Sequence, residues 1–197
     1  MKKSILSFLL VLSLTALALF GLSFGLQPVA TKNAQAEHLR IMQTLLPGSK
    51  TFQAEPYTGE DANIRSVHKG ENGFVIETAT QGYADEIVML IGVSNDGKVT
   101  GLVIKQMHET LGLGFNALTD WEFLAQFLNT SGGVSIGTAG EDAFTGATGA
   151  DSSETETYVD AITGATVTSK AIARCVNSAV GYVTGADADS GATSWGG

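Results

Sequence analysis

The chain has few of the residues that metal and nucleic-acid binding require. Its 197 residues include one cysteine and three histidines, and none of these form a cluster with metal-ligand spacing, which argues against haem, zinc and iron–sulfur sites. Lysine and arginine total 11 against 20 acidic residues, giving a net charge of −9. So acidic a chain is a poor candidate for nucleic-acid binding. The lone Cys175 cannot form an intrachain disulfide, and we expect it in the core.

A long segment near the N-terminus also lacks charge. Lys2 and Lys3 are charged, but no charged residue follows over positions 4–31. About 20 apolar residues suffice to span a bilayer as a helix, and the preceding lysines favour a cytoplasmic N-terminus. We therefore expect residues 1–3 in the cytoplasm, a single transmembrane anchor over residues 4–30 in the inner (cytoplasmic) membrane, and the C-terminal domain outside. A signal peptide cleaved after Ala36 is the alternative, although signal apolar regions usually span only about 7–15 residues.

The remainder predicts one α+β domain, of twisted antiparallel strands with segregated helices, over residues 49–184. Residues 31–48 are predicted to form a juxtamembrane helix that stops at Pro47-Gly48, and residues 185–197 a flexible tail. The segment 56–73 has no regular pattern.

Strand signals begin after that segment, over residues 74–79, 86–94 and 98–105. The last two flank Asn95-Asp96-Gly97, a strong hairpin signal. A helix capped by Thr119 or Asp120 is then expected, followed by a short strand near Val134.

The most informative motif precedes a second helix. Asp160-Ala-Ile-Thr-Gly-Ala-Thr166-Val-Thr-Ser169 leads into a segment whose apolar residues recur at steps of three and four up to residue 183. Backbone N–H groups at a helix start are unpaired, and the helix dipole there favours an anion. Thr163 or Asp160 are candidate caps, and Lys170 adds positive charge. These residues alone are compatible with an ordinary capped helix and with a phosphate site.

Two near-copies of this motif end at Thr148 and Thr193. Thr148 runs into an acidic segment rich in small residues, and Thr193 lies four residues from the end of the sequence. Only Thr166 opens a predicted helix with basic residues in its early turns, so the helix context separates it from the copies.

A second motif, His108-Glu109-Thr110-Leu111-Gly112-Leu113-Gly114, follows the predicted hairpin. A zinc-protease helix needs a second histidine four residues after the first, where Gly112 stands here. By its residues alone, this is a glycine-rich loop leaving a strand, with a structural His108.

Both motifs, in this order, together with Gly82-Tyr83 and Ile87 before the hairpin, resemble the FMN-binding domain family. That family includes the G subunit of the Rnf electron-transport complex and the C subunit of the sodium-pumping NADH:quinone reductase. The resemblance implies that Thr166 carries covalent FMN through a phosphoester bond. Leu111 stands where the family usually has proline. The cofactor-binding residues that the resemblance implies are Thr163, Gly164, Ala165, Thr166, Thr168, Ser169, Lys170, His108, Glu109, Thr110, Leu111 and Gly112.

The resemblance further implies a membrane-anchored flavoprotein electron carrier, one component of an Rnf-type ion-translocating ferredoxin:NAD oxidoreductase. No side chain is expected to act as acid, base or nucleophile, because the flavin carries the redox chemistry. The implied partners are other membrane subunits of that complex and a flavin transferase that attaches the FMN. The alternatives are a stand-alone extracytoplasmic flavoprotein, a quinone-reductase subunit or, in another class, a non-redox anchored binding module.

Overall fold

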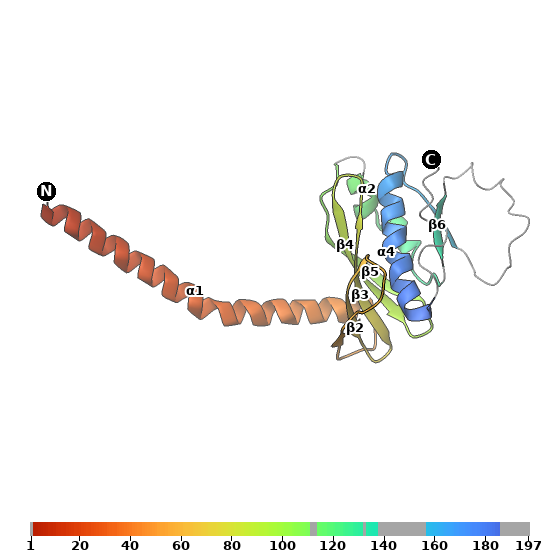
Figure 1. Ribbon diagram of the computed structural model, residues 1–197, viewed down its shortest axis with the longest axis horizontal. Coiled ribbons are helices and arrows are strands. Elements are labelled where there is room, and N and C mark those ends of the chain that lie inside the picture. Colours follow the sequence, from red (N-terminus) through yellow and green to blue (C-terminus); the bar gives the residue numbers. More distant parts are fainter. Residues whose placement is uncertain (1, 111–113, 132, 138–156, 186–197) are drawn as a thin grey trace, which may run out of the picture. The chain divides into compact units, whose positions relative to one another are not determined.

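The computed structural model describes residues 2–110, 114–131, 133–137 and 157–185 (Figure 1). The chain divides into two compact units, Met1–Ile41 and Met42–Gly197. The first unit is helical: α1 runs without interruption over Lys2–Leu45, through the segments predicted as anchor and juxtamembrane helix. Among the described residues, no helix is both long and apolar enough to cross a membrane.

The second unit is built on a five-stranded antiparallel sheet in which each strand pairs with the next along the chain. The strands are β1 (Gln53–Glu55), β2 (Ile64–Lys69), β3 (Gly73–Gln81), β4 (Glu86–Ser94) and β5 (Val99–Gln106). The three predicted strands are thereby confirmed as β3, β4 and β5, with ends shifted by at most a few residues.

The hairpin between β4 and β5 is also confirmed. The Ser94 N–H donates to the Lys98 carbonyl at 2.8 Å, and the Gly97 N–H donates to the Ser94 carbonyl at 2.9 Å. Gly97 has a φ of +79°, in the left-handed region that glycine enters without steric cost. The turn chemistry of the sequence therefore sets this connection.

The prediction that residues 56–73 are irregular was wrong, because β2 lies within them. Its register with β3 shifts between Ile64 and Ser66, as at a β-bulge. Ile64 and Val67 are both buried although they stand three positions apart. A bulge breaks the two-residue alternation by which a strand is recognised in a sequence, so this strand carried no such signal.

The described helices of this unit are α2 (Gly114–Thr119), α3 (Trp121–Ala125) and α4 (Thr166–Thr184). Asp120 caps α3, as predicted: its carboxylate accepts from the N–H groups of Glu122 at 2.9 Å and Phe123 at 3.1 Å. The predicted helix is short and ends at Ala125, and α2 was not predicted.

The strand predicted near Val134 is confirmed as β6 (Val134–Gly137), but its partner β7 (Thr157–Asp160) was missed. These two strands pair in parallel. The sequence had suggested antiparallel strands throughout the domain, and this part of the prediction was wrong. Asn177 on α4 anchors β6, because its side-chain amide both accepts from the Val134 N–H at 2.8 Å and donates to the Val134 carbonyl at 3.0 Å.

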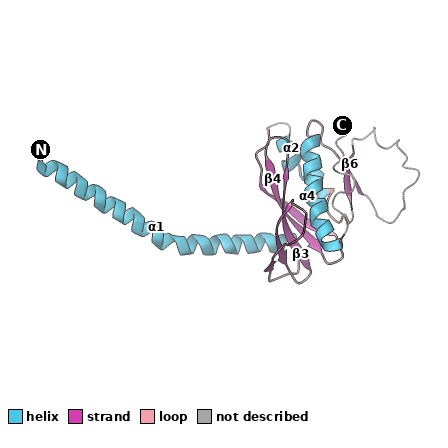
Figure 2. Cartoon of the chain, viewed as in Figure 1, coloured by secondary structure: helices cyan, strands magenta, loops and turns pink. Residues whose placement is uncertain are grey.

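The core lies between α4 and the central strands β3 and β4, against which the helix packs (Figures 1 and 2). The fully buried residues include Ile76, Ile91 and Ile172. Cys175 lies in this core as predicted, and burial raises the pKa of its thiol to about 12. The packing holds the first turn of α4 beside the turn between β3 and β4, and the candidate site forms there.

Candidate functional site

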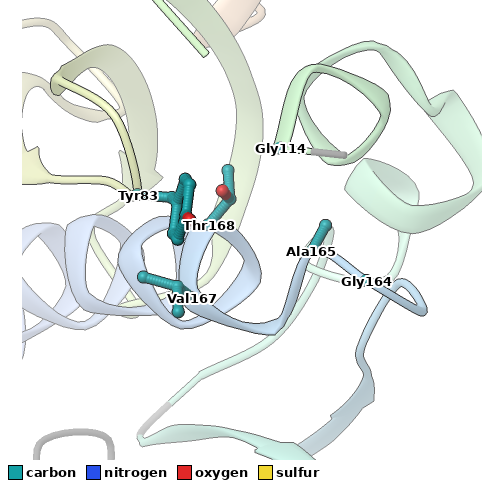
Figure 3. A pocket seen from close by; sticks show the side chains of 6 residues that line it. All are labelled: Tyr83, Gly114, Gly164, Ala165, Val167 and Thr168. Carbon is teal, nitrogen blue, oxygen red and sulfur yellow. The ribbon is translucent and has the colours of Figure 1, made fainter. Parts of the chain in front are cut away.

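A pocket of about 180 Å³ opens where the start of α4 meets the β3–β4 turn and the start of α2 (Figure 3). Tyr83 comes from the turn and Gly114 from the first position of α2. The loop before α4 and its first turn supply the rest of the lining, which consists of Gly164, Ala165, Val167 and Thr168. The two sequence motifs are therefore brought together in space.

The start of α4 has no side-chain cap. Ala165 occupies the N-cap position, and no side-chain oxygen accepts a hydrogen bond there. The expected caps were wrong: Thr163 is exposed and Asp160 is the last residue of β7, where its N–H donates to Gln126 Oε1 at 3.1 Å. The first-turn N–H groups of α4 therefore keep their capacity to bind an anion.

The residues of the helix motif point in different directions. Thr166 is the first residue of α4 and half-buried, and it stands between two pocket-lining residues without lining the pocket itself. Lys170, also half-buried, lies one turn later on the same helix face. Ser169 is fully buried, and its Oγ accepts from the Ile162 N–H at 3.4 Å, so it holds the preceding loop in place. Gly164 has a φ of +79°, which favours glycine at this turn.

Glu109 ties the second motif to the β3–β4 turn. Its Oε1 accepts from the N–H groups of Tyr83 at 2.8 Å and Ala84 at 3.3 Å. His108 is exposed, with Nδ1 3.4 Å from Asp85 Oδ2, and so lies away from the pocket lining.

The other residues of that loop contribute less to the described site. Thr110 is exposed, and its carbonyl accepts from the Phe115 N–H at 3.2 Å. Leu111 and Gly112 lie outside the described residues, as do the near-copy threonines Thr148 and Thr193.

Two buried oxygens at the pocket have no hydrogen-bond partner in the part of the chain that the structure describes: Glu109 Oε2 and Thr168 Oγ1. Both pack closely against Gly114, where a side chain would collide with them. A β carbon at Gly114 would lie 2.5 Å from Thr168 Oγ1 and closer still to Glu109 Oε2. Buried polar atoms are nearly always hydrogen-bonded, so this pair fits a bound group that carries polar hydrogens.

The sequence alone did not identify Tyr83 and Val167 as pocket residues, whereas Gly114 belongs to a loop that was expected at the cofactor. Tyr83 and Gly114 stood within the quoted motifs, but only the fold shows that they face the same space. Val167 follows the apolar period of α4, which by itself favours a place against the core. Tyr83 is 65% exposed, so its ring remains available to a ligand.

Comparison with known proteins finds one matching family model and several similar G subunits. The model of the FMN-binding domain family matches residues 82–181. The G subunit of the ion-translocating oxidoreductase complex of Methanosarcina acetivorans is 32% identical to this chain. The alignment covers 89% of this chain and 91% of that subunit. The G subunit of the Na⁺-translocating ferredoxin:NAD⁺ oxidoreductase complex of Acetobacterium woodii is 37% identical over 55% of this chain and 47% of its own length.

A solved structure, that of the C subunit of the Na⁺-translocating NADH-quinone reductase of Parabacteroides distasonis, aligns with a TM-score of 0.45 at 21% identity, covering 63% of each chain. The G subunit of the proton-translocating ferredoxin:NAD⁺ oxidoreductase complex of Clostridium ljungdahlii is 38% identical over 56% of this chain and 53% of its own length. The family match covers half of the chain, and the Methanosarcina acetivorans relative is matched over nearly its full length. The chain therefore belongs to the FMN-binding domain family.

Proposed function

We propose that this chain carries covalently bound FMN and transfers electrons as the G subunit of an Rnf-type ion-translocating ferredoxin:NAD oxidoreductase. One observation carries the proposal: in an FMN-binding family member, the uncapped start of α4 adjoins a pocket with two unpartnered buried oxygens. When bound, FMN supplies one- and two-electron redox chemistry, and the protein positions and tunes it. Its partners in this proposal are the other membrane subunits of the complex.

The phosphate is assigned to the first turn of α4. The Thr166 hydroxyl is the proposed attachment point, through a phosphoester formed by a flavin transferase. The product retains a negative charge, which the N–H groups of Thr166, Val167 and Thr168 stabilise. The helix dipole contributes about 0.3–1 kcal/mol at an exposed helix start. Lys170 adds a positive charge on the same helix face as Thr166.

The rest of the FMN is assigned to the pocket and its rim. Tyr83 and Val167 offer the apolar surface that a flavin ring requires. The pocket, at about 180 Å³, is smaller than the roughly 300–1,000 Å³ of sites that enclose a whole ligand. Part of the cofactor therefore stays accessible at the surface, which suits a carrier that exchanges electrons with other subunits.

Covalent flavin is directly measurable. We expect the full chain, produced together with a flavin transferase, to gain the mass of FMN and to give a fluorescent band after denaturing gel electrophoresis. The chain produced without the transferase is the control and should show neither. Flavin that is released on denaturation would contradict covalent attachment. Protein with no flavin at all would contradict the flavoprotein assignment and favour a non-redox binding module.

We also propose that residues 4–30 cross the inner membrane once, with residues 1–3 in the cytoplasm. In this arrangement residues 31–48 form the juxtamembrane helix, and residues 49–184 form the extracytoplasmic domain. The support is the uncharged run, the lysine pair before it and the unbroken α1 helix.

Reporter fusions after Thr184 test this topology. A reporter that is active only outside the cytoplasm should be active there, and a cytoplasm-dependent reporter should be silent. The reverse result would contradict the orientation. A mature N-terminus at Glu37 would show instead that the segment is cleaved.

A further inference from the structure

We propose that the start of α3 and the strand β7 form a docking surface for another protein subunit that presents lysine and arginine side chains. This α3–β7 surface consists of five exposed residues: Asp120, Trp121 and Glu122 at the start of α3, and Tyr158 and Asp160 of β7. The identification of the partner as a subunit of the same complex rests on the proposed function.

Two large aromatic side chains are exposed on the α3–β7 surface. Trp121 is 73% exposed and Tyr158 is 68% exposed. Phe123 and Phe127, from the same segment as Trp121, are buried and supply its aromatic contacts to the core. Trp121 is therefore not needed to hold the segment in place. Tryptophan and tyrosine are enriched at protein interfaces, where a few such side chains carry much of the binding energy.

The start of α3 and the end of β7 belong to one surface. Gln126, directly after α3, accepts with its Oε1 from the Asp160 N–H of β7 at 3.1 Å. Glu122 stands four positions before Gln126, and residues at this spacing share one face of a helix. Glu122 therefore lies on the side of α3 that is turned toward Asp160, with Trp121 as its neighbour in the chain.

The carboxylates of this surface have no basic neighbours in their own segment. Positions 109–169 contain no lysine, arginine or histidine, although acidic residues recur throughout. Glu122 and Asp160 form no ion pair with any residue that the structure describes. On the five-stranded sheet, by contrast, Glu77 pairs with Lys105 at 2.8 Å. The negative charge at α3 and β7 is therefore not offset by ion pairs, so it attracts a basic surface and steers its approach.

The chemistry of the surface selects a basic protein over other partners. Nucleic acids and anionic lipid membranes carry negative charge, which the carboxylates would repel. An aromatic anchor beside charged side chains is instead typical of a protein interface, in which the aromatic side chain is buried and the charges form the rim.

The α3–β7 surface also lies close to the pocket. Asp160 ends β7, and the pocket-lining Gly164 follows four residues later, so their α carbons are at most about 14 Å apart. On the other side, α2 begins at the pocket-lining Gly114 and leads directly into the Asp120 cap of α3. A subunit docked on this surface would therefore border the opening of the pocket.

Site-specific crosslinking tests the proposal in membranes that contain the whole complex. A photoreactive benzoylphenylalanine replaces Trp121 in the full chain and keeps an aromatic ring at that position. The same probe at Glu60, exposed in the β1–β2 connection, is the control. We expect position 121 to crosslink to another subunit through a peptide that contains lysine or arginine, and position 60 not to give this crosslink.

Charge reversal then tests the chemistry of the partner. Glu122→Lys should lower the yield of the crosslink from position 121 by roughly tenfold, because it replaces an attraction with a repulsion. Glu60→Lys makes the same change of charge outside the surface and should leave the yield unchanged. Glu122 is an exposed residue, so both variants should keep the covalent FMN mass of the wild type.

The other outcomes would overturn the proposal. No crosslink from position 121, or a crosslink only to lipid or to a second copy of this chain, would contradict the docking surface. An unchanged yield in Glu122→Lys would contradict the basic chemistry of the partner. Failure of the proposed function is distinguishable, because wild-type protein would then carry no covalent FMN mass, whatever the crosslinks show.

Discussion

Thr166→Ala should abolish covalent FMN completely, whereas Thr148→Ala and Thr193→Ala should retain it, although all three threonines end similar motifs. Thr166 is the first residue of α4, whose first turn lacks a side-chain cap. The phosphodiester made there keeps a negative charge, which unpaired N–H groups and a nearby lysine stabilise. Around Thr148 the sequence instead places Glu141, Asp142 and Asp151, which would repel a new anion.

The measurement is intact-protein mass together with in-gel fluorescence, on full-length chains produced with a flavin transferase. A Thr166→Ala protein that still carries the FMN mass would contradict the attachment site. Loss of FMN in Thr148→Ala alone would show that helix context does not select the threonine. The two near-copy variants are matched controls, because each removes the same hydroxyl from a similar motif.

Phe127→Ala should produce the largest loss of stability among single core truncations, about 3–5 kcal/mol in the free energy of unfolding. The Phe127 side chain is 0% exposed and packs edge-on against the Phe123 ring, with ring centroids 5.3 Å apart. Truncation removes apolar contacts and leaves a cavity in the core beside Phe123 of α3.

Trp121→Ala is the matched control, because it truncates another aromatic residue of the same segment whose surface is 73% exposed. Its effect should stay within about 0.5 kcal/mol. Urea unfolding of both variants, with the wild type alongside, gives the comparison. Similar losses for the two variants would contradict the assignment of Phe127 to the core.

Several elements of the domain follow from short stretches of sequence. The hairpin at Asn95-Asp96-Gly97, the Asp120 cap and the helix from Thr166 were all recognisable in this way. Each rests on interactions between residues a few positions apart, such as turn geometry, capping and the apolar period of a helix. Both motifs of the candidate site were visible for the same reason.

Other elements depend on contacts between distant segments. The pairing of β6 with β7 joins strands on either side of a long connection, and the bulged β2 has no alternating pattern of its own. Asp160 looked like a helix cap by position alone, but it became the end of β7 once that strand paired. A strand gains its stability from partners elsewhere in the chain, so these outcomes were not readable locally.

For the site itself, the sequence identified the candidate residues: the small and hydroxyl-bearing residues before α4 and the His-Glu-Thr loop after β5. Only the tertiary structure decided which of them meet. It packed Thr168 and Glu109 against Gly114, added Tyr83 from another turn, and left His108 and Thr163 exposed. The physical reason is that motif spacing sets residue identity and local backbone, whereas the packing of α4 against β3 and β4 sets which side chains face one pocket.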